Sequence, residues 1–319
     1  MMRFLPTDEQ LAFAEAVDEI VDGHGGTDIP QAWAAGDTAP GLELWRQFAE
    51  LGLGGLRLPE EDGGLGGSAV DLVVVFERLG YHAVPGPYLE SLALLPRLVD
   101  ASTRAELAGG AVATACVERV APFALDADAA ALRFAIDDEG IAPAAAGASI
   151  ASLARVRRLN ALTPGARTPL DRETLSGALD EASLAAAAQL VGAGERLLHE
   201  AVEYAKIREQ FGQQVGAYQA LKHQLADVRV ALSFARPLVH AAALALDGPT
   251  RARDVSAAKV AAGAAARRAA RTALQVHGAI GYTAEHPVGL WIALAPALDA
   301  AWGTPTFHRA RVSRALARV

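Results

Sequence analysis

The amino-acid sequence predicts a mainly α-helical protein with a reduced β-rich segment in its middle. From residue 172 onward, apolar residues recur at helical spacing in four long runs. Between residues 108 and 171 the pattern changes to short apolar segments of strand length. We therefore expect an N-terminal helical domain (1–107), a reduced β domain (108–171) and a C-terminal helical bundle (172–319).

Composition narrows the class of protein. The 319 residues carry 29 basic and 37 acidic side chains, a net charge of −8, which disfavours a nucleic-acid partner. No apolar run is long enough to span a bilayer, and residues 1–10 lack an apolar signal core, so no membrane association is expected. The single cysteine, Cys116, suits a reducing compartment and excludes a disulfide framework. These features predict a cytoplasmic protein, and we assign no metal ligands.

The N-terminal region begins with a predicted helix. Thr7 and Gln10 stand at the two positions of a capping box, and His24-Gly25-Gly26 ends the helical spacing. Residues 27–40 contain Pro30, Gly36 and Pro40 and are expected to form a loop. Two more helices are predicted, from Glu43 to Leu51 and, after a glycine-rich turn, from a cap at Ser68 to Leu79.

The middle segment contains few strand signals. Three short strands are predicted, and Asp137 to Gly140 is typical of a hairpin turn. An alanine-rich stretch from Ala142 to Ala151 carries few polar side chains. The strands are expected at Val112–Val117, Leu132–Ile136 and Val156–Leu162.

The C-terminal segment predicts a helical bundle. Its third helix carries a stripe of small residues on one face, which lets neighbouring helices approach closely. The stripe consists of Val255, Ala258, Ala262, Ala266, Ala269 and Ala273. The four long helices are expected at about 172–208, 217–247, 250–277 and 287–301, with a shorter one reaching Arg318.

The junction between the first two bundle helices is the strongest candidate site. Arg208, Phe211 and Gln219 place a cation, an aromatic ring and an amide around a turn that contains Gly212. Such a set can bind an anion and a flat ring, although composition alone favours a solvated polar turn between helices.

The residues around this turn resemble the acyl-CoA dehydrogenase signature: a Tyr, then Arg-x-x-Phe-Gly, then a Gln eight residues after the Phe. A later Gln275-Val276-His277-Gly278-Ala279-Ile280-Gly281 resembles the family's Gln-x-x-Gly-Gly-x-Gly motif, with Ala279 in place of the second glycine. The resemblance implies that Arg208, Phe211, Gln219, Gln275, Gly278 and Ala279 reach the FAD of a neighbouring subunit. His277 is expected to be a helix-end residue, not a base.

Two parts of the family pattern are missing. The β segment lacks the Thr-Glu-x-x-Gly-Ser stretch and the Trp-centred stretch that hold the flavin ring. Where the resemblance puts the catalytic Glu stands Trp302, whose indole is a donor only and accepts no proton. The family's alternative Glu position is Ala182; Glu181 beside it is turned about 100° away, and we expect a solvated helix-start acid there.

With these two parts missing, the chain resembles the smaller, catalytically incomplete subunit of bacterial α2β2 acyl-CoA dehydrogenases that act on steroid-derived CoA thioesters. It implies a larger partner with an intact Glu, an acyl-CoA substrate, a shared FAD and an electron-transfer acceptor for the complex. Two alternatives stay open. One is a self-sufficient homo-oligomer that uses Glu285 or Asp299 as its acid, and the other is a non-catalytic scaffold of the same fold.

Overall fold

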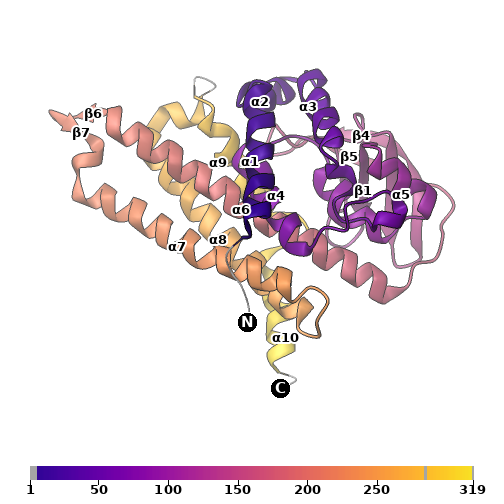
Figure 1. The fold of residues 1–319 in the computed structure, drawn as a ribbon. Coiled ribbons are helices and arrows are strands. Elements are labelled where there is room, and N and C mark those ends of the chain that lie inside the picture. Colours follow the sequence, from indigo (N-terminus) through magenta and orange to yellow (C-terminus); the bar gives the residue numbers. More distant parts are fainter. Residues whose placement is uncertain (1–5, 284–285, 318–319) are drawn as a thin grey trace.

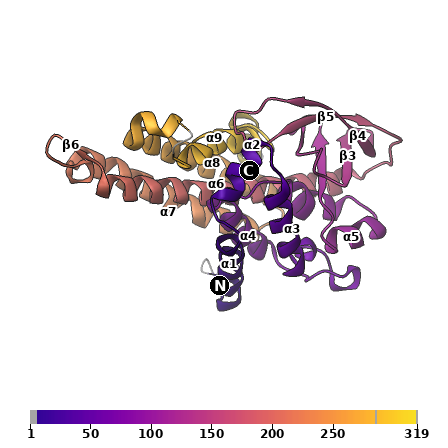
Figure 2. The same cartoon turned by 90° about the horizontal axis from the view of Figure 1, so that it is seen from above.

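A long central helix, α6 (Arg172–Ile207), organises the computed structural model, which describes residues 6–283 and 286–317. Helices from both the N-terminal and the C-terminal parts of the chain pack against α6. Figures 1 and 2 show a small sheet at one end of the molecule and a two-stranded hairpin at the opposite end of the helical bundle. In the described ranges no helix is long and apolar enough to cross a membrane.

Local capping explains where the N-terminal helices begin. The predicted capping box at Thr7 and Gln10 is confirmed, and Ser68 forms a second one with Asp71. A turn of π-helix, η3 (Glu90–Leu94), follows these helices and is buried. The helices are α1 (Asp8–Gly23), α2 (Asp28–Ala35), α3 (Ala39–Glu50), α4 (Ala69–Tyr81) and α5 (Ala101–Ala108), and short 3-10 turns lie at Leu53–Gly55, Glu60–Asp62 and Leu95–Arg97.

The prediction of a loop over residues 27–40 is wrong, because α2 and the start of α3 occupy this stretch. Pro30 lies in the first turn of α2, where its missing N–H costs no intrahelical hydrogen bond. Gly36 ends the helix at φ +99°, a conformation that glycine adopts without strain. Proline and glycine therefore mark the ends of a short helix here.

The sheet contains five strands in the order β1-β3-β4-β5-β2. The β1–β3 pair is parallel and the others are antiparallel, with the predicted turn joining β3 to β4 through the pair Asp137 and Gly140. The alanine-rich stretch forms a strand that was not predicted, and the third predicted strand begins at Leu159 instead of Val156. The strands are β1 (Ala113–Val117), β2 (Ala124–Leu125), β3 (Leu132–Asp137), β4 (Gly140–Ile150) and β5 (Leu159–Pro164).

The four long bundle helices agree with the prediction to within three residues at each end, and the stripe of small residues on α8 is buried as expected. Two glycines set the crossing of α4 and α6. A Cβ on Gly192 would lie 1.8 Å from the Glu77 carbonyl oxygen, and one on Gly80 would lie 2.1 Å from that of Gln189. The remaining helices are α7 (Gln219–Leu244), α8 (Arg251–His277), α9 (Val288–Ala300) and α10 (Pro305–Leu316), with 3-10 turns at Val215–Ala217 and Gly278–Tyr282.

Candidate functional site

The junction between α6 and α7 is a small β-hairpin, formed by β6 (Glu209–Gln210) and β7 (Gln213–Gln214). Its two central residues, Phe211 and Gly212, have φ values of +53° and +80°. Positive φ at both positions is typical of the type I′ turn, which is costly for a phenylalanine. Phe211 is 93% exposed, so no intrachain packing of its side chain offsets this cost. The hairpin therefore carries an exposed aromatic ring at the end of the bundle.

Arg208 lies at the base of the hairpin as the C-cap of α6, and its backbone accepts a hydrogen bond from Val215 N at 2.8 Å. Its side chain is exposed and has no ion pair within the described ranges. Gln219, the first residue of α7, is exposed as well. A free guanidinium and a free amide thus flank the exposed ring of Phe211.

The C-terminal end of α8 lies against the same end of α6. The ring of His277 stacks on that of Tyr204 with a centroid distance of 4.4 Å, and its Nδ1 lies 2.8 Å from the Ala273 carbonyl oxygen. His277 is buried and is the last residue of α8, which confirms its predicted position at the helix end. The neighbouring Gln275, Gly278 and Ala279 are exposed, and a Cβ built on Gly278, at φ +62°, would meet no other atom within 4 Å. All six predicted cofactor residues therefore lie at one end of the bundle.

Trp302 occupies the turn between α9 and α10, with φ +57° and 2% exposure. Its carbonyl oxygen lies 3.1 Å from Ser183 Oγ and 3.0 Å from His308 Nε2. Because a carbonyl only accepts, His308 carries its proton on Nε2 and accepts at Nδ1 from the Ser256 hydroxyl, 3.1 Å away. Burial is the main cause that lowers the pKa of His308 to about 4.

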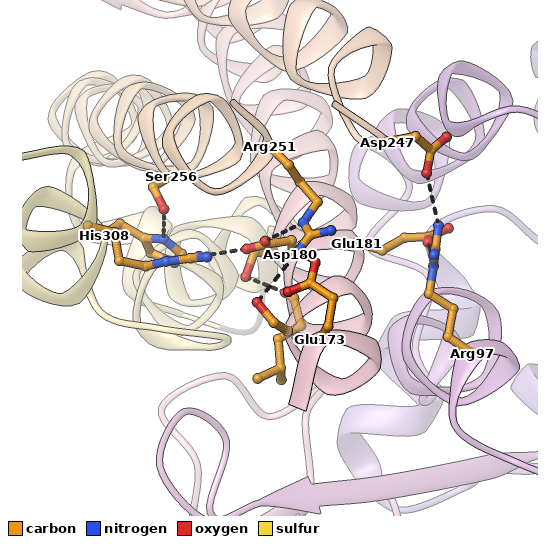
Figure 3. Close-up of polar contacts among 12 residues, drawn as sticks. Arg97, Glu173, Asp180, Glu181, Asp247, Arg251, Ser256 and His308 are labelled. Atoms are coloured by element: carbon orange, nitrogen blue, oxygen red, sulfur yellow. Dashed lines mark hydrogen bonds and ion pairs between the residues drawn. The ribbon is translucent and has the colours of Figure 1, made fainter. Parts of the chain in front are cut away.

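Glu181 is not the solvated acid that the sequence suggested. It is 1% exposed and forms ion pairs with Arg57 and Arg97 of the N-terminal region. Its neighbour Asp180 forms ion pairs with Arg251 at 2.8 Å and Arg311 at 2.6 Å. Figure 3 shows Arg97 approaching Glu181 from one side, while Arg251 approaches Asp180 from the other. The ion pairs of Glu181 join α6 to the N-terminal region, so the geometry gives this residue a structural role.

The homo-oligomer alternative named Glu285 and Asp299 as candidate acids, and the structure describes only the second. Glu285 lies outside the described residues. Asp299 is buried and forms an ion pair with Arg267 at 2.7 Å, and its Oδ1 fills the space beside Gly263 on α8. Asp299 therefore stabilises the packing of α9 on α8, where Lys259 also donates to the Leu298 and Asp299 carbonyl oxygens.

A cavity of about 380 Å³ lies beside Trp302, and sequence reasoning missed the two charged residues in its wall, Glu90 and Arg157. Glu90 is the one charged residue in the buried stretch 88–95, a signal that the sequence did offer. Arg157 carries no comparable signal, because it is one of several arginines between β4 and β5.

Comparisons with known proteins agree with this architecture. The acyl-CoA dehydrogenase C-terminal domain matches residues 173–317, and the N-terminal domain of the same family matches residues 7–96. The acyl-CoA dehydrogenase IpdE2 of Mycobacterium tuberculosis is 35% identical over 295 residues, which cover 90% of each chain. The chain belongs to the acyl-CoA dehydrogenase family. IpdE2 of Mycolicibacterium smegmatis is 34% identical over 291 residues, covering 89% of this chain and 91% of that one.

Solved structures share the fold over the whole chain. The ChsE4-ChsE5 complex from Mycobacterium tuberculosis matches with a TM-score of 0.84 at 24% identity and covers 100% of both chains. The Tcur3481-Tcur3483 steroid ACAD matches with a TM-score of 0.84 at 22% identity and covers 98% of both. The family match supports an FAD-dependent oxidoreductase.

The exposed end of the bundle fits part of an FAD site. The guanidinium of Arg208 suits a pyrophosphate, the ring of Phe211 is free to stack, and the open backbone at Gly278 permits close approach. The cavity beside Trp302 fits a flavin less well. Residues Val120, Ala121, Pro122 and Phe123 in its wall carry no polar side chain.

Proposed function

We propose that this chain is the smaller subunit of a heteromeric FAD-dependent acyl-CoA dehydrogenase. In this proposal a larger partner holds the catalytic Glu and the flavin ring, and this chain completes the partner's FAD site in trans. Bound there, FAD would supply the hydride acceptor for the α,β-dehydrogenation of an acyl-CoA thioester. This chain contributes Arg208, Phe211 and Gln219 from the hairpin, and Gln275, Gly278 and Ala279 from the end of α8.

The single observation that carries the proposal is the exposed hairpin. Phe211 holds a costly backbone conformation while its ring is almost fully exposed, and Arg208 beside it has no ion pair in the part of the chain described. Strain and exposure together are what a site requires when its ligand belongs to another subunit. A role in scaffolding alone gives no reason for this set of side chains.

The two positions from which the family draws its base lack a carboxylate here, which supports assigning the chemistry to the partner. The turn that carries the Glu in the family contains the indole of Trp302, and Ala182 stands at the alternative position. Glu181 and Asp299 are both engaged in ion pairs. These positions give no carboxylate that is free to remove a proton beside a thioester carbonyl.

An apolar stripe on α7 supports association with a partner. Val230, Phe234 and Leu238 recur every four residues and are exposed, Phe234 by 74%. A contiguous apolar surface on a helix marks a protein interface. We further propose that the substrate is a steroid-derived CoA thioester, because the Tcur3481-Tcur3483 neighbour is a steroid ACAD. The assembly proposed is α2β2.

The flavin content of the purified complex tests the proposal. If only the larger subunit holds a flavin ring, an α2β2 complex contains two FAD. In the variant Arg208→Ala, loss of a charge-assisted hydrogen bond costs about 1.5–3 kcal/mol, so FAD affinity should fall by about one to two orders of magnitude. Flavin absorbance titrated against protein measures both quantities.

Arg271→Ala is the matched control, because Arg271 is an exposed arginine on α8 outside the motif. This variant should keep its flavin. Four FAD per tetramer, or full flavin retention in Arg208→Ala, would show that the hairpin does not serve the partner's cofactor.

A further inference from the structure

The cavity beside Trp302 is largely apolar. It lies where the end of α9, the segment 120–123 and the residues between β4 and β5 meet, and its volume is about 380 Å³. Phe123, Leu153, Ala297 and Trp302 form much of its wall. This size falls within the range of small-molecule pockets, which join apolar walls to a few polar groups.

Glu90 is the first of these polar groups. It is only 2% exposed, and its Oε2 has no hydrogen-bond partner within the described residues. Desolvation raises its pKa to about 7. Glu90 begins the π-helical turn η3, a backbone form often found at functional sites. A buried carboxyl oxygen without a partner costs about 1–3 kcal/mol, and a ligand that donates a hydrogen bond to this oxygen would offset that cost.

Arg157 is the second polar group and lines the same cavity. Its guanidinium forms no ion pair or hydrogen bond with any described residue. Glu90 and Asp126 interact with it only through longer-range electrostatic attraction. Asp126 is already engaged by Arg158 at 3.0 Å and by Trp33 Nε1 at 3.0 Å. Glu90 and Arg157 therefore face one cavity without pairing, although a direct ion pair would satisfy both.

We propose that this cavity binds an amphipathic hydroxy acid, whose carboxylate pairs with Arg157, whose hydroxyl donates to Glu90 and whose hydrocarbon body packs on Trp302. A guanidinium is suited to a carboxylate, which it can bind with two parallel hydrogen bonds. A carboxyl oxygen that lacks a donor is suited to a hydroxyl. The site goes beyond the proposed function, because it lies within this chain and not at the hairpin that serves the partner's cofactor.

Calorimetric titration of the purified native assembly tests the site, with 3-hydroxydecanoate and decanoate as probes. The wild type should bind both acids and prefer the hydroxylated one. Arg157→Gln should weaken both by at least about tenfold, as expected for loss of a charge-assisted contact. Glu90→Leu should keep decanoate binding and bring the two affinities to within about twofold of each other.

Arg155→Gln is the matched control, because Arg155 is exposed in the same segment and does not line the cavity. It should bind both acids like the wild type, and flavin content should be unchanged in all three variants. No binding by the wild type, equal binding by Arg157→Gln, or loss of flavin instead of acid in that variant would overturn the proposal.

Quenching of tryptophan fluorescence by 10-bromodecanoate is a second test of the site. It remains informative even if Arg157→Gln or Glu90→Leu fails to fold. The quenching should be strong in the wild type and largely lost in Trp302→Phe, because Trp302 lies in the cavity wall. Equal quenching in the two proteins would place the acid elsewhere and overturn the proposal.

Discussion

The hydroxyl oxygen of Ser183, on α6, lies 3.1 Å from the carbonyl oxygen of Trp302. The same hydroxyl lies 2.8 Å from the Leu179 carbonyl oxygen, so its one proton is shared between two acceptors. Ser183 follows Ala182 directly. The family draws its base either from this part of α6 or from the turn at Trp302. In this chain the hydrogen bond joins these two segments and has a structural role.

The variant Trp302→Glu should not create a working base. A carboxylate there would be buried without an assigned partner, and loss of the indole would cost about 3 kcal/mol of stability. Turnover of the complex should stay within a few-fold of wild type, with Trp302→Phe as the control for lost volume. A large gain in turnover would mean that this chain positions flavin and substrate itself.

Expressed alone, the chain should be colourless and should aggregate, because the apolar stripe on α7 would face water. Co-expression with the larger subunit should restore a monodisperse, yellow preparation, as seen by size-exclusion chromatography and absorbance. Replacing Phe234 and Leu238 with Ser should make the lone chain more soluble and weaken assembly. A soluble, yellow and active chain by itself would contradict the heteromeric assignment.

The variant Glu90→Gln should change how stability depends on pH. The pKa of Glu90 is raised from 4.5 to about 7 in the folded protein, so its protonated form contributes stability below pH 4.5 that is lost as the pH rises through 7. The variant should match wild type at low pH and exceed it at pH 8 by up to about 3 kcal/mol. Urea denaturation at pH 5 and 8 measures this, with the exposed Glu106→Gln as control. If wild type and Glu90→Gln showed the same dependence of stability on pH, burial would not raise the pKa of Glu90.

The ionisation of His308 should make stability depend on pH in the opposite direction to that of Glu90. Its pKa is lowered from 6.5 to about 4 in the folded protein, so the stability from its neutral form is present above pH 6.5 and is lost as the pH falls toward 4. His308→Gln keeps a donor for the Trp302 carbonyl and should flatten the acid limb of the stability profile by up to about 3 kcal/mol. The exposed His223→Gln should leave that limb unchanged, and an unchanged limb in His308→Gln would contradict a neutral, buried imidazole.

Much of the helical framework could be read from the sequence, because caps and helical periodicity are local signals. Thr7 and Ser68 begin helices where predicted, and the small residues of α8 are buried as expected. Residues 27–40 were misread because proline and glycine mark helix ends as well as loops. The strand β4 was missed because its alanines favour helices in isolation and depend on pairing with β3 and β5.

The amino-acid sequence by itself determined the long bundle helices, the two capped N-terminal helices and the order of the segments around Arg208, Phe211 and Gln275, and the family resemblance added that Trp302 stands at the Glu position. Those are matters of residue type and spacing along one chain. Only the tertiary structure decided that Glu181 is buried between Arg57 and Arg97, and that Glu90 and Arg157 face one cavity. The partners of a buried charge come from distant segments, so its environment depends on packing and cannot be read from its neighbours in sequence.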